Sequence, residues 1–267
     1  MNRQPAVAGY FYPGEKARLE KDLNALLPAR QEKTKAVAIV VPHAGYMYSG
    51  SVAGEVYSSL DLPETFVILC PNHTGQGSDF DLWSEGDWGT PLGNAAVDVD
   101  LTKELMRKFP NAVADGRAHI KEHSLEVQLP FLQYLKGKIS FVPLCIRGWH
   151  FEPLEQLGIA ISKLIRDSGR EILIIASSDM THYESQQSAQ LKDRLAIREM
   201  EKLDARGLYD TVHQNDISMC GYLPATSAII AAKQLGAKSG RLVKYATSGD
   251  VTGDYSSVVG YAGMIFA

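Results

Sequence analysis

Three of the seven histidines in the chain each follow a short apolar run within a few residues. A continuous β-branched run is typical of a strand covered on both faces, and sites collect at the carboxyl ends of such strands. We therefore expect the three imidazoles to meet, and imidazole binds zinc, iron, copper and nickel. A single histidine at a strand end is usually a hydrogen-bonded polar residue, so this prediction depends on the three together. The runs and their histidines are 36–41 with His43, 66–70 with His73 and 172–176 with His182.

Two further residues could complete such a site. Cys220 precedes an Ala-rich segment that predicts a buried helix, and a helix N-terminus favours the thiolate form that binds metals. A buried packing thiol would give the same pattern, so both interpretations stay open. His123 stands between Glu122 and Ser124, where a neighbouring carboxylate would either orient its imidazole or solvate it.

The other cysteines and histidines are predicted to have no chemical role. Cys70 and Cys145 lie inside apolar runs, which is typical of small core side chains. His119, His150 and His213 lie in polar or loop surroundings, so we expect them at the surface.

The elements that must position these residues alternate along the chain. Apolar runs interleaved with amphipathic segments predict an α/β fold with a mostly parallel or mixed central sheet and helices on both faces. No linker or repeat interrupts the pattern, so residues 1–267 are expected to form a single domain. Further strands are expected at 141–146 and 258–266, a hairpin excursion at 80–98, and helices at 15–27, 122–135, 152–166, 186–204 and 224–235.

Composition excludes several classes of protein. The 267 residues are 45% hydrophobic and 22% charged, which is ordinary for a globular protein with a sizeable core. A net charge of -4 gives no basic excess for nucleic acid or an anionic membrane. Three cysteines, an odd number, exclude a disulfide scaffold. With no signal peptide and no spanning segment, a cytoplasmic location is expected.

Several short motifs, taken in order, resemble the Memo family, whose prokaryotic members are often called AmmeMemoRadiSam system protein B. Each motif is short, but their collective occurrence in this order is highly specific, and the resemblance covers essentially the whole chain. The motifs are Ala8-Gly9-Tyr10-Phe11-Tyr12, Val41-Pro42-His43-Ala44-Gly45-Tyr46, Pro71-Asn72-His73, Glu122-His123-Ser124-Leu125-Glu126, Ser177-Ser178-Asp179-Met180-Thr181-His182, Cys220-Gly221 and Gly260-Tyr261-Ala262-Gly263.

The resemblance implies a fold similar to that of class III extradiol dioxygenases, which hold a non-haem Fe(II) with two histidines and a carboxylate. It implies that His43 and His73 are metal ligands and that Cys220 takes the place of the carboxylate. It also implies that His182 is the counterpart of the acid/base histidine and that Asp179 is a further pocket residue. We expect Asp179 to have a catalytic role, in which it orients His182 or approaches the metal as an occasional fourth ligand.

The resemblance also bears on substrate and metal. Tyr48 falls on a position that contacts peptide in eukaryotic relatives, whereas Phe11 stands where those relatives have a tryptophan. We expect His123 to have a catalytic role, in which it donates to the substrate or to bound oxygen. Two imidazoles and one thiolate form a soft ligand set that suits Fe(II), copper or zinc.

The leading hypothesis is a metal-dependent redox enzyme of dioxygenase-like architecture and unknown substrate, with Fe(II) or copper as the expected cofactor and zinc as an alternative. A second hypothesis is a zinc hydrolase. A third is a non-catalytic module that binds metal or peptide. The resemblance implies a radical-SAM protein and an AMMECR-type protein as its partners.

Overall fold

The central sheet is mixed, and its middle strands are parallel. The computed structural model describes residues 2–30, 32–148 and 150–267. Its strands are β1 (Ala38–Val41), β2 (Thr65–Pro71), β3 (Phe80–Leu82), β4 (Asp87–Thr90), β5 (Gly93–Val97), β6 (Ser140–Ile146), β7 (Ile172–Ser177), β8 (His182–Glu184), β9 (Gly240–Thr247) and β10 (Val258–Phe266). The order is β4-β5-β6-β2-β7-β1-β10-β8, with β3 on β6 and β9 on β10. The pairs from β5 to β1 are parallel, and β10 runs antiparallel to β1, β8 and β9.

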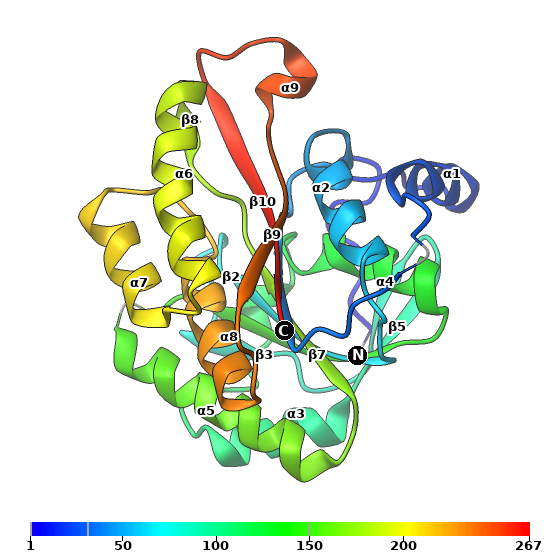
Figure 1. The fold of residues 1–267 in the computed structure, drawn as a ribbon. Helices are drawn as coiled ribbons and strands as arrows, with labels where there is room; N and C mark the ends of the chain where they lie inside the picture. The colour runs from blue at the N-terminus through cyan, green and yellow to red at the C-terminus, as the bar shows by residue number, and fades with distance from the viewer. Residues whose placement is uncertain (1, 31, 149) are drawn as a thin grey trace.

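Helices cover both faces of this sheet. Figure 1 shows α1, α2 and α4 on one side of the strands and α3, α5, α7 and α8 on the other. The helices are α1 (Lys16–Leu26), α2 (Tyr46–Ser58), α3 (Val99–Lys108), α4 (Leu129–Lys136), α5 (Phe151–Ser168), α6 (Gln186–Glu201), α7 (Ala205–Gln214), α8 (Tyr222–Gln234) and α9 (Gly249–Thr252), with 3-10 turns η1 (Arg117–His119) and η2 (Glu126–Gln128). The predicted single α/β domain, with a mixed sheet between helices, is confirmed.

Side chains along the inner strands point alternately to the two faces of the sheet, so two hydrophobic cores form. In β7, Ile172 and Ile174 join the core beneath α5 and α8, whereas Leu173 and Ile175 join the core beneath α2 and α4. Every residue of β7 is buried, because a strand covered on both faces exposes neither set of side chains. Burying such a side chain contributes about 1.5–3 kcal/mol. The strands that carry the site are therefore held from both sides.

Two predictions about local structure were wrong. The helix expected at 122–135 begins only at Leu129, after η2, and residues 122–125 form an irregular turn. The turn lets Glu122 point inward, where His73 and Ser124 donate hydrogen bonds to its carboxylate. His119 was expected at the surface but is fully buried.

Several elements had no counterpart in the predicted pattern. They are α2, α3, α7, α9, β8, β9 and the 3-10 turn η1. The remaining predicted strands and helices are present with bounds shifted by a few residues, and the hairpin expected at 80–98 contains the antiparallel pair β4 and β5.

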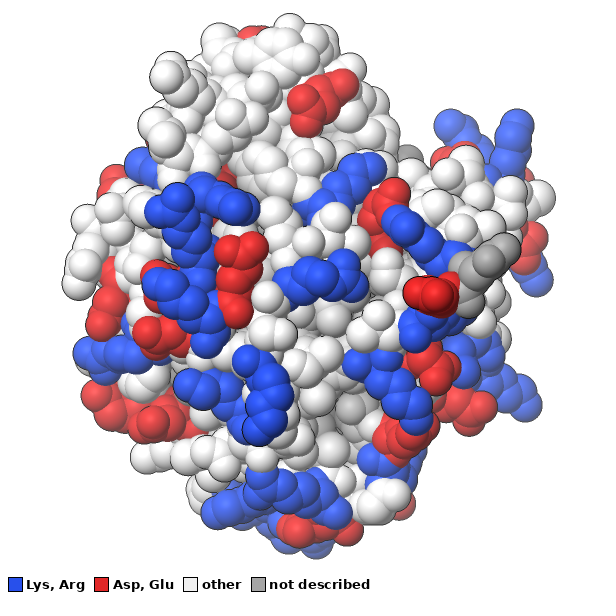
Figure 2. Space-filling view, in the orientation of Figure 1, with Lys and Arg blue, Asp and Glu red and all other residues white. Residues whose placement is uncertain are grey.

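Charges are mixed over the surface. Figure 2 shows Lys and Arg intermingled with Asp and Glu on one face, whereas the top, where Figure 1 places α9, is mostly uncharged. None of the helices in the described ranges combines the length and apolarity needed to cross a bilayer.

Candidate metal centre

The site lies at the carboxyl ends of three neighbouring strands. β2, β7 and β1 are adjacent and parallel, and His73, Asp179 and His43 each stand within two residues of the end of one of them. Parallel strands bring their carboxyl ends to one edge of a sheet, as in other α/β proteins. This arrangement brings together residues that are far apart in the sequence.

His43 is buried, and its ring is fixed by Ser177. The Ser177 hydroxyl donates its single hydrogen to the Ser124 carbonyl, 2.6 Å away. It must therefore accept at 2.9 Å from the His43 Nδ1–H, as it does from Gln128 Nε2. Burial, followed by repulsion from His123, lowers the pKa of His43 well below its usual value. The neutral ring thus keeps Nε2 free of hydrogen.

Glu122 fixes His73. The carboxylate is fully buried, and it accepts from the backbone N–H of His73 at 2.6 Å and from the ring Nδ1 at 2.8 Å. Burial acts to raise the pKa of Glu122, but the hydrogen bond and charge of His73 outweigh it and lower the pKa to about 2. Burial acts to lower the pKa of His73, and Glu122 outweighs it in turn and raises the pKa. A carboxylate behind an imidazole is the usual support of a metal-binding histidine.

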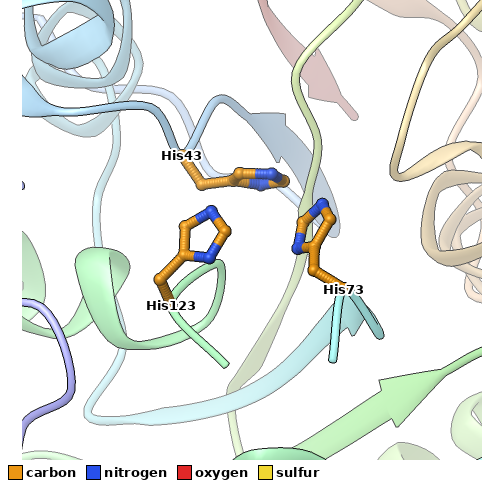
Figure 3. A group of neighbouring side chains, drawn as sticks. All are labelled: His43, His73 and His123. Atoms are coloured by element: carbon orange, nitrogen blue, oxygen red, sulfur yellow. The ribbon is translucent and has the colours of Figure 1, made fainter. Parts of the chain in front are cut away.

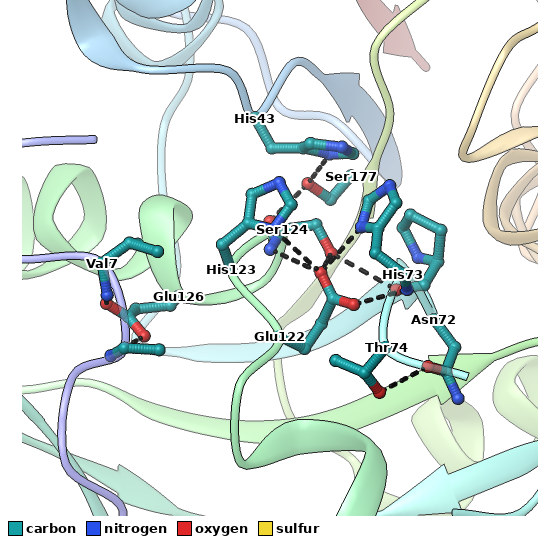
Figure 4. A network of polar contacts seen from close by, with 12 residues as sticks. Val7, His43, Asn72, His73, Thr74, Glu122, His123, Ser124, Glu126 and Ser177 are labelled. Carbon is teal, nitrogen blue, oxygen red and sulfur yellow. Dashed lines mark hydrogen bonds and ion pairs between the residues drawn. The ribbon is translucent and has the colours of Figure 1, made fainter. Parts of the chain in front are cut away.

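His123 completes a group of three imidazoles. Its Nδ1 lies 3.4 Å from the same Glu122 carboxylate, and the Phe11 ring packs against it with centroids 4.7 Å apart. Burial is the main cause that lowers the pKa of His123. One ligand atom from each of His43, His73 and His123 lies within 4.8 Å of the others. Figure 3 shows the rings directed toward one another, and Figure 4 shows Glu122 behind two of them.

Cys220 reaches the same place from the start of α8. Its Sγ lies 3.3 Å from His43 Nε2 and accepts the backbone N–H of Asp179 at 3.3 Å. Gly221 allows this approach, because a Cβ there would collide with the Ser177 carbonyl oxygen. Burial, with the charge of Asp179, raises the pKa of the Cys220 thiol well above its usual value. Cys220, which was predicted as a metal ligand, therefore contacts His43. His123, which was predicted as a catalytic residue, instead lies in the same group as the two predicted histidine ligands.

Asp179 and His182 line the same cavity. The Asp179 carboxylate accepts from the His43 backbone N–H at 2.7 Å, and burial raises its pKa to about 6. His182 Nδ1 lies 2.9 Å from the Ser218 carbonyl oxygen. A carbonyl only accepts, so Nδ1 carries the hydrogen and Nε2 of the neutral ring is an acceptor. The cavity has a volume of about 640 Å³, and Tyr48, the predicted substrate contact, lines it.

The residues that support the site were mostly missed by sequence reasoning. Ser177 lies within a recognised motif, but its contact with His43 crosses 134 positions. Arg3 belongs to none of the motifs, although it is buried and forms an ion pair of 2.7 Å with Glu126. Its guanidinium also donates to the carbonyls of His119 and Glu122, at 2.7 Å each. The turn that carries His123 is thus tied to the N-terminal segment, and no local spacing signals this contact.

Buried His119 gives a prediction about acid stability. Burial lowers its pKa from 6.5 to about 4. Between these two pH values His119 is therefore protonated in the unfolded chain and neutral in the folded chain. The free energy of unfolding is therefore highest above pH 6.5 and falls as the pH is lowered toward 4. The titration of His119 contributes about 3 kcal/mol to this loss. We expect urea unfolding of His119→Asn to show a smaller loss over that range than the unsubstituted protein.

A matched control uses the exposed His150. His150→Asn should leave the pH dependence of unfolding unchanged. If His119→Asn and the parent chain lose equal free energy between pH 6.5 and about 4, burial does not control this titration.

Comparisons with known proteins agree with the motifs. A MEMO1 family protein of Methanopyrus kandleri is 44% identical over 280 residues, covering 100% of this chain and 99% of the relative. A MEMO1 family protein of Aquifex aeolicus is 44% identical over 266 residues, covering 99% and 98%. An uncharacterized protein of Escherichia coli K12 shares the fold, with a TM-score of 0.51 and 15% identity over 86% of this chain and 100% of that chain.

The family assignment covers nearly the full sequence. The family model described as Memo-like protein matches residues 3–265, which includes every motif that suggested the resemblance. The chain therefore belongs to the Memo-like protein family.

Proposed function

We propose that the chain is a metal-dependent redox enzyme that acts on a small organic substrate in the cavity beside the three histidines. The observation that carries the proposal is the clustering of His43, His73 and His123 within 4.8 Å. Support for two of the rings comes from their Nδ1 partners, Ser177 and Glu122. These partners leave the Nε2 atoms of both rings available to a shared ion.

The donor set fits a transition metal. Three imidazoles suit zinc, copper, iron and nickel. Metal–nitrogen and metal–sulfur bonds of about 2.0–2.3 Å place two ligands of one ion about 3–4 Å apart. The separation of 3.3 Å between Cys220 Sγ and His43 Nε2 is of this size. We therefore assign the three histidines to the metal and propose Cys220 as an additional sulfur ligand.

A redox role favours iron(II) or copper, since zinc has a single oxidation state. When bound, iron or copper would supply electron transfer and activation of the substrate. His182 would act as the base, because its Nε2 is the free acceptor and its ring is held by Ser218. Asp179 holds the His43 backbone N–H and would orient the substrate. Tyr48 would contact the substrate from the cavity wall.

A zinc hydrolase is the second candidate, because three histidines with one open position form a known catalytic zinc set. Asp179 or His182 would then be the general base toward a water. The two candidates differ in their dependence on oxygen and on the metal supplied. Oxygen consumption with iron or copper supports the redox enzyme, whereas turnover with zinc that is indifferent to oxygen supports the hydrolase.

The proposal is tested first by elemental analysis of protein purified without added metal. We expect one transition-metal ion per chain, with nearly complete loss in His43→Ala, His73→Ala and His123→Ala. Cys220→Ser should keep the ion with weaker affinity, and the exposed His213→Ala should keep it fully. Thermal unfolding of each variant shows that it is folded. Equal metal content in all five variants would overturn the proposal.

A further inference from the structure

The cavity extends outward from the histidines to a mouth with aromatic walls. Phe11, Tyr48, Tyr183 and Tyr261 line it. Three of these rings carry phenol groups, namely Tyr48, Tyr183 and Tyr261. Aromatic side chains therefore line the cavity from Phe11, which packs against His123, to the exposed Tyr183.

The acidic residues of the described cavity lining are Asp179 and Asp254, which lie there with four histidines. Asp254 lines the cavity, whereas no Lys or Arg is found among its lining residues within the described ranges. The Ser256 hydroxyl and backbone N–H donate to the Asp254 carboxylate at 2.6 and 2.9 Å, and they lower its pKa. The surrounding segment 248–257 contains two aspartates and no basic residue. Figure 2 shows the corresponding region around α9 as largely uncharged apart from acidic side chains.

Tyr183 is presented at this mouth by a strained backbone. Its φ is 59°, one of three positive values among the described non-glycine residues, and its side chain is 79% exposed. Such a conformation is strained for a residue other than glycine and persists where surrounding contacts impose it. Here the neighbouring His182 is fixed by Ser218, and β8 pairs with β10. An exposed ring held in this way is available to a ligand.

We propose that the mouth of the cavity binds an organic cation, the ammonium group of a ligand whose other end reaches toward the histidines. Aromatic faces attract cations, and the attraction grows as the cation is desolvated. A carboxylate beside them adds attraction, and the described lining offers no Lys or Arg that would hold an anion there. The inference depends on the proposed function only for the direction in which the ligand points.

The test uses metal-free protein, prepared with a chelator, and three probes that share a phenyl ring and differ in tail charge. They are 2-phenylethylammonium, 2-phenylethanol and 3-phenylpropionate, and their binding is measured by titration calorimetry near neutral pH. We expect the ammonium probe to bind about tenfold more tightly than the carboxylate probe, with the alcohol between them. Equal affinities, or a preference for the carboxylate, would overturn the proposal.

Single substitutions test whether the preference for the ammonium probe arises at the mouth of the cavity. Asp254→Asn should reduce the tenfold preference to about threefold, since water screens an exposed ion pair and keeps its contribution modest. Tyr183→Leu should weaken the ammonium probe more than the alcohol. Asp250→Asn removes an equal charge from α9, outside the cavity lining, and should change nothing. If Asp250→Asn and Asp254→Asn act alike, the preference comes from general charge and the site is not at the mouth.

The metal content of the purified protein is measured independently of these titrations. A chain that binds metal but does not prefer the ammonium probe contradicts only this inference. A chain that prefers the ammonium probe but holds no metal contradicts only the proposed function.

Discussion

Arg3→Met should lower the free energy of unfolding by about 3–5 kcal/mol. Arg3 and Glu126 are both buried and form an ion pair of 2.7 Å. The substitution would leave the Glu126 charge inside the protein and deprive the carbonyls of His119 and Glu122 of their donor. Glu126 would still accept from two backbone N–H groups and from Tyr12, so folding should survive. Urea unfolding followed by circular dichroism measures the change.

An exposed arginine provides the matched control. Arg117 pairs with Asp115, but its side chain is 67% exposed. Arg117→Met should therefore lower the free energy of unfolding far less than Arg3→Met, because water screens an exposed pair. Arg3→Lys keeps the charge but lacks the planar fork that reaches several acceptors, so we expect it to recover only part of the loss. Similar losses in the free energy of unfolding for Arg3→Met and Arg117→Met would show that burial does not make the Arg3–Glu126 pair more important for stability.

Glu122→Gln should weaken metal binding by about 10–100-fold. The carboxylate accepts from the ring and backbone of His73 and from Ser124. An amide of the same shape presents an N–H group to one of these donors, so the His73 ring loses its fixed orientation. Competition with a chromogenic chelator measures the dissociation constant of the protein–metal complex.

The comparison for this prediction is Glu171→Gln. Glu171 forms an exposed pair with Lys35 and lies outside the site, so its substitution should leave the dissociation constant unchanged. An unchanged constant in Glu122→Gln, with bound metal still present, would mean that the carboxylate does not support the ligands.

The fold was largely predictable because each buried strand is a continuous run of apolar residues in the sequence. The inner strands are continuous apolar runs, and the residues that follow them, His43 and His73, meet because parallel strands end at one edge. α2 was missed because its glycines weaken the helical pattern. Gly54 is needed there, because a Cβ would collide with the Leu26 carbonyl oxygen of α1.

The supporting contacts were not predictable in the same way. Arg3 meets Glu126 across 123 positions, and His43 meets Cys220 across 177. Neither pair has a spacing that a helix or a hairpin would impose. The position of His123 depended on an irregular turn, which formed in place of the expected helix because Glu122 turns inward to its buried donors. Motif order located these segments, but only the folded chain brings their side chains into contact.

The histidine group joins three separate stretches of the polypeptide, two after strands and one in the turn before α4. An ion held there would act as a cross-link that closes two long loops of chain at once. Since such an ion binds the native state and not the disordered chain, its affinity would add to the resistance of the whole molecule to heat. Loading and chelation should therefore shift the melting temperature as well as the chemistry of the cavity.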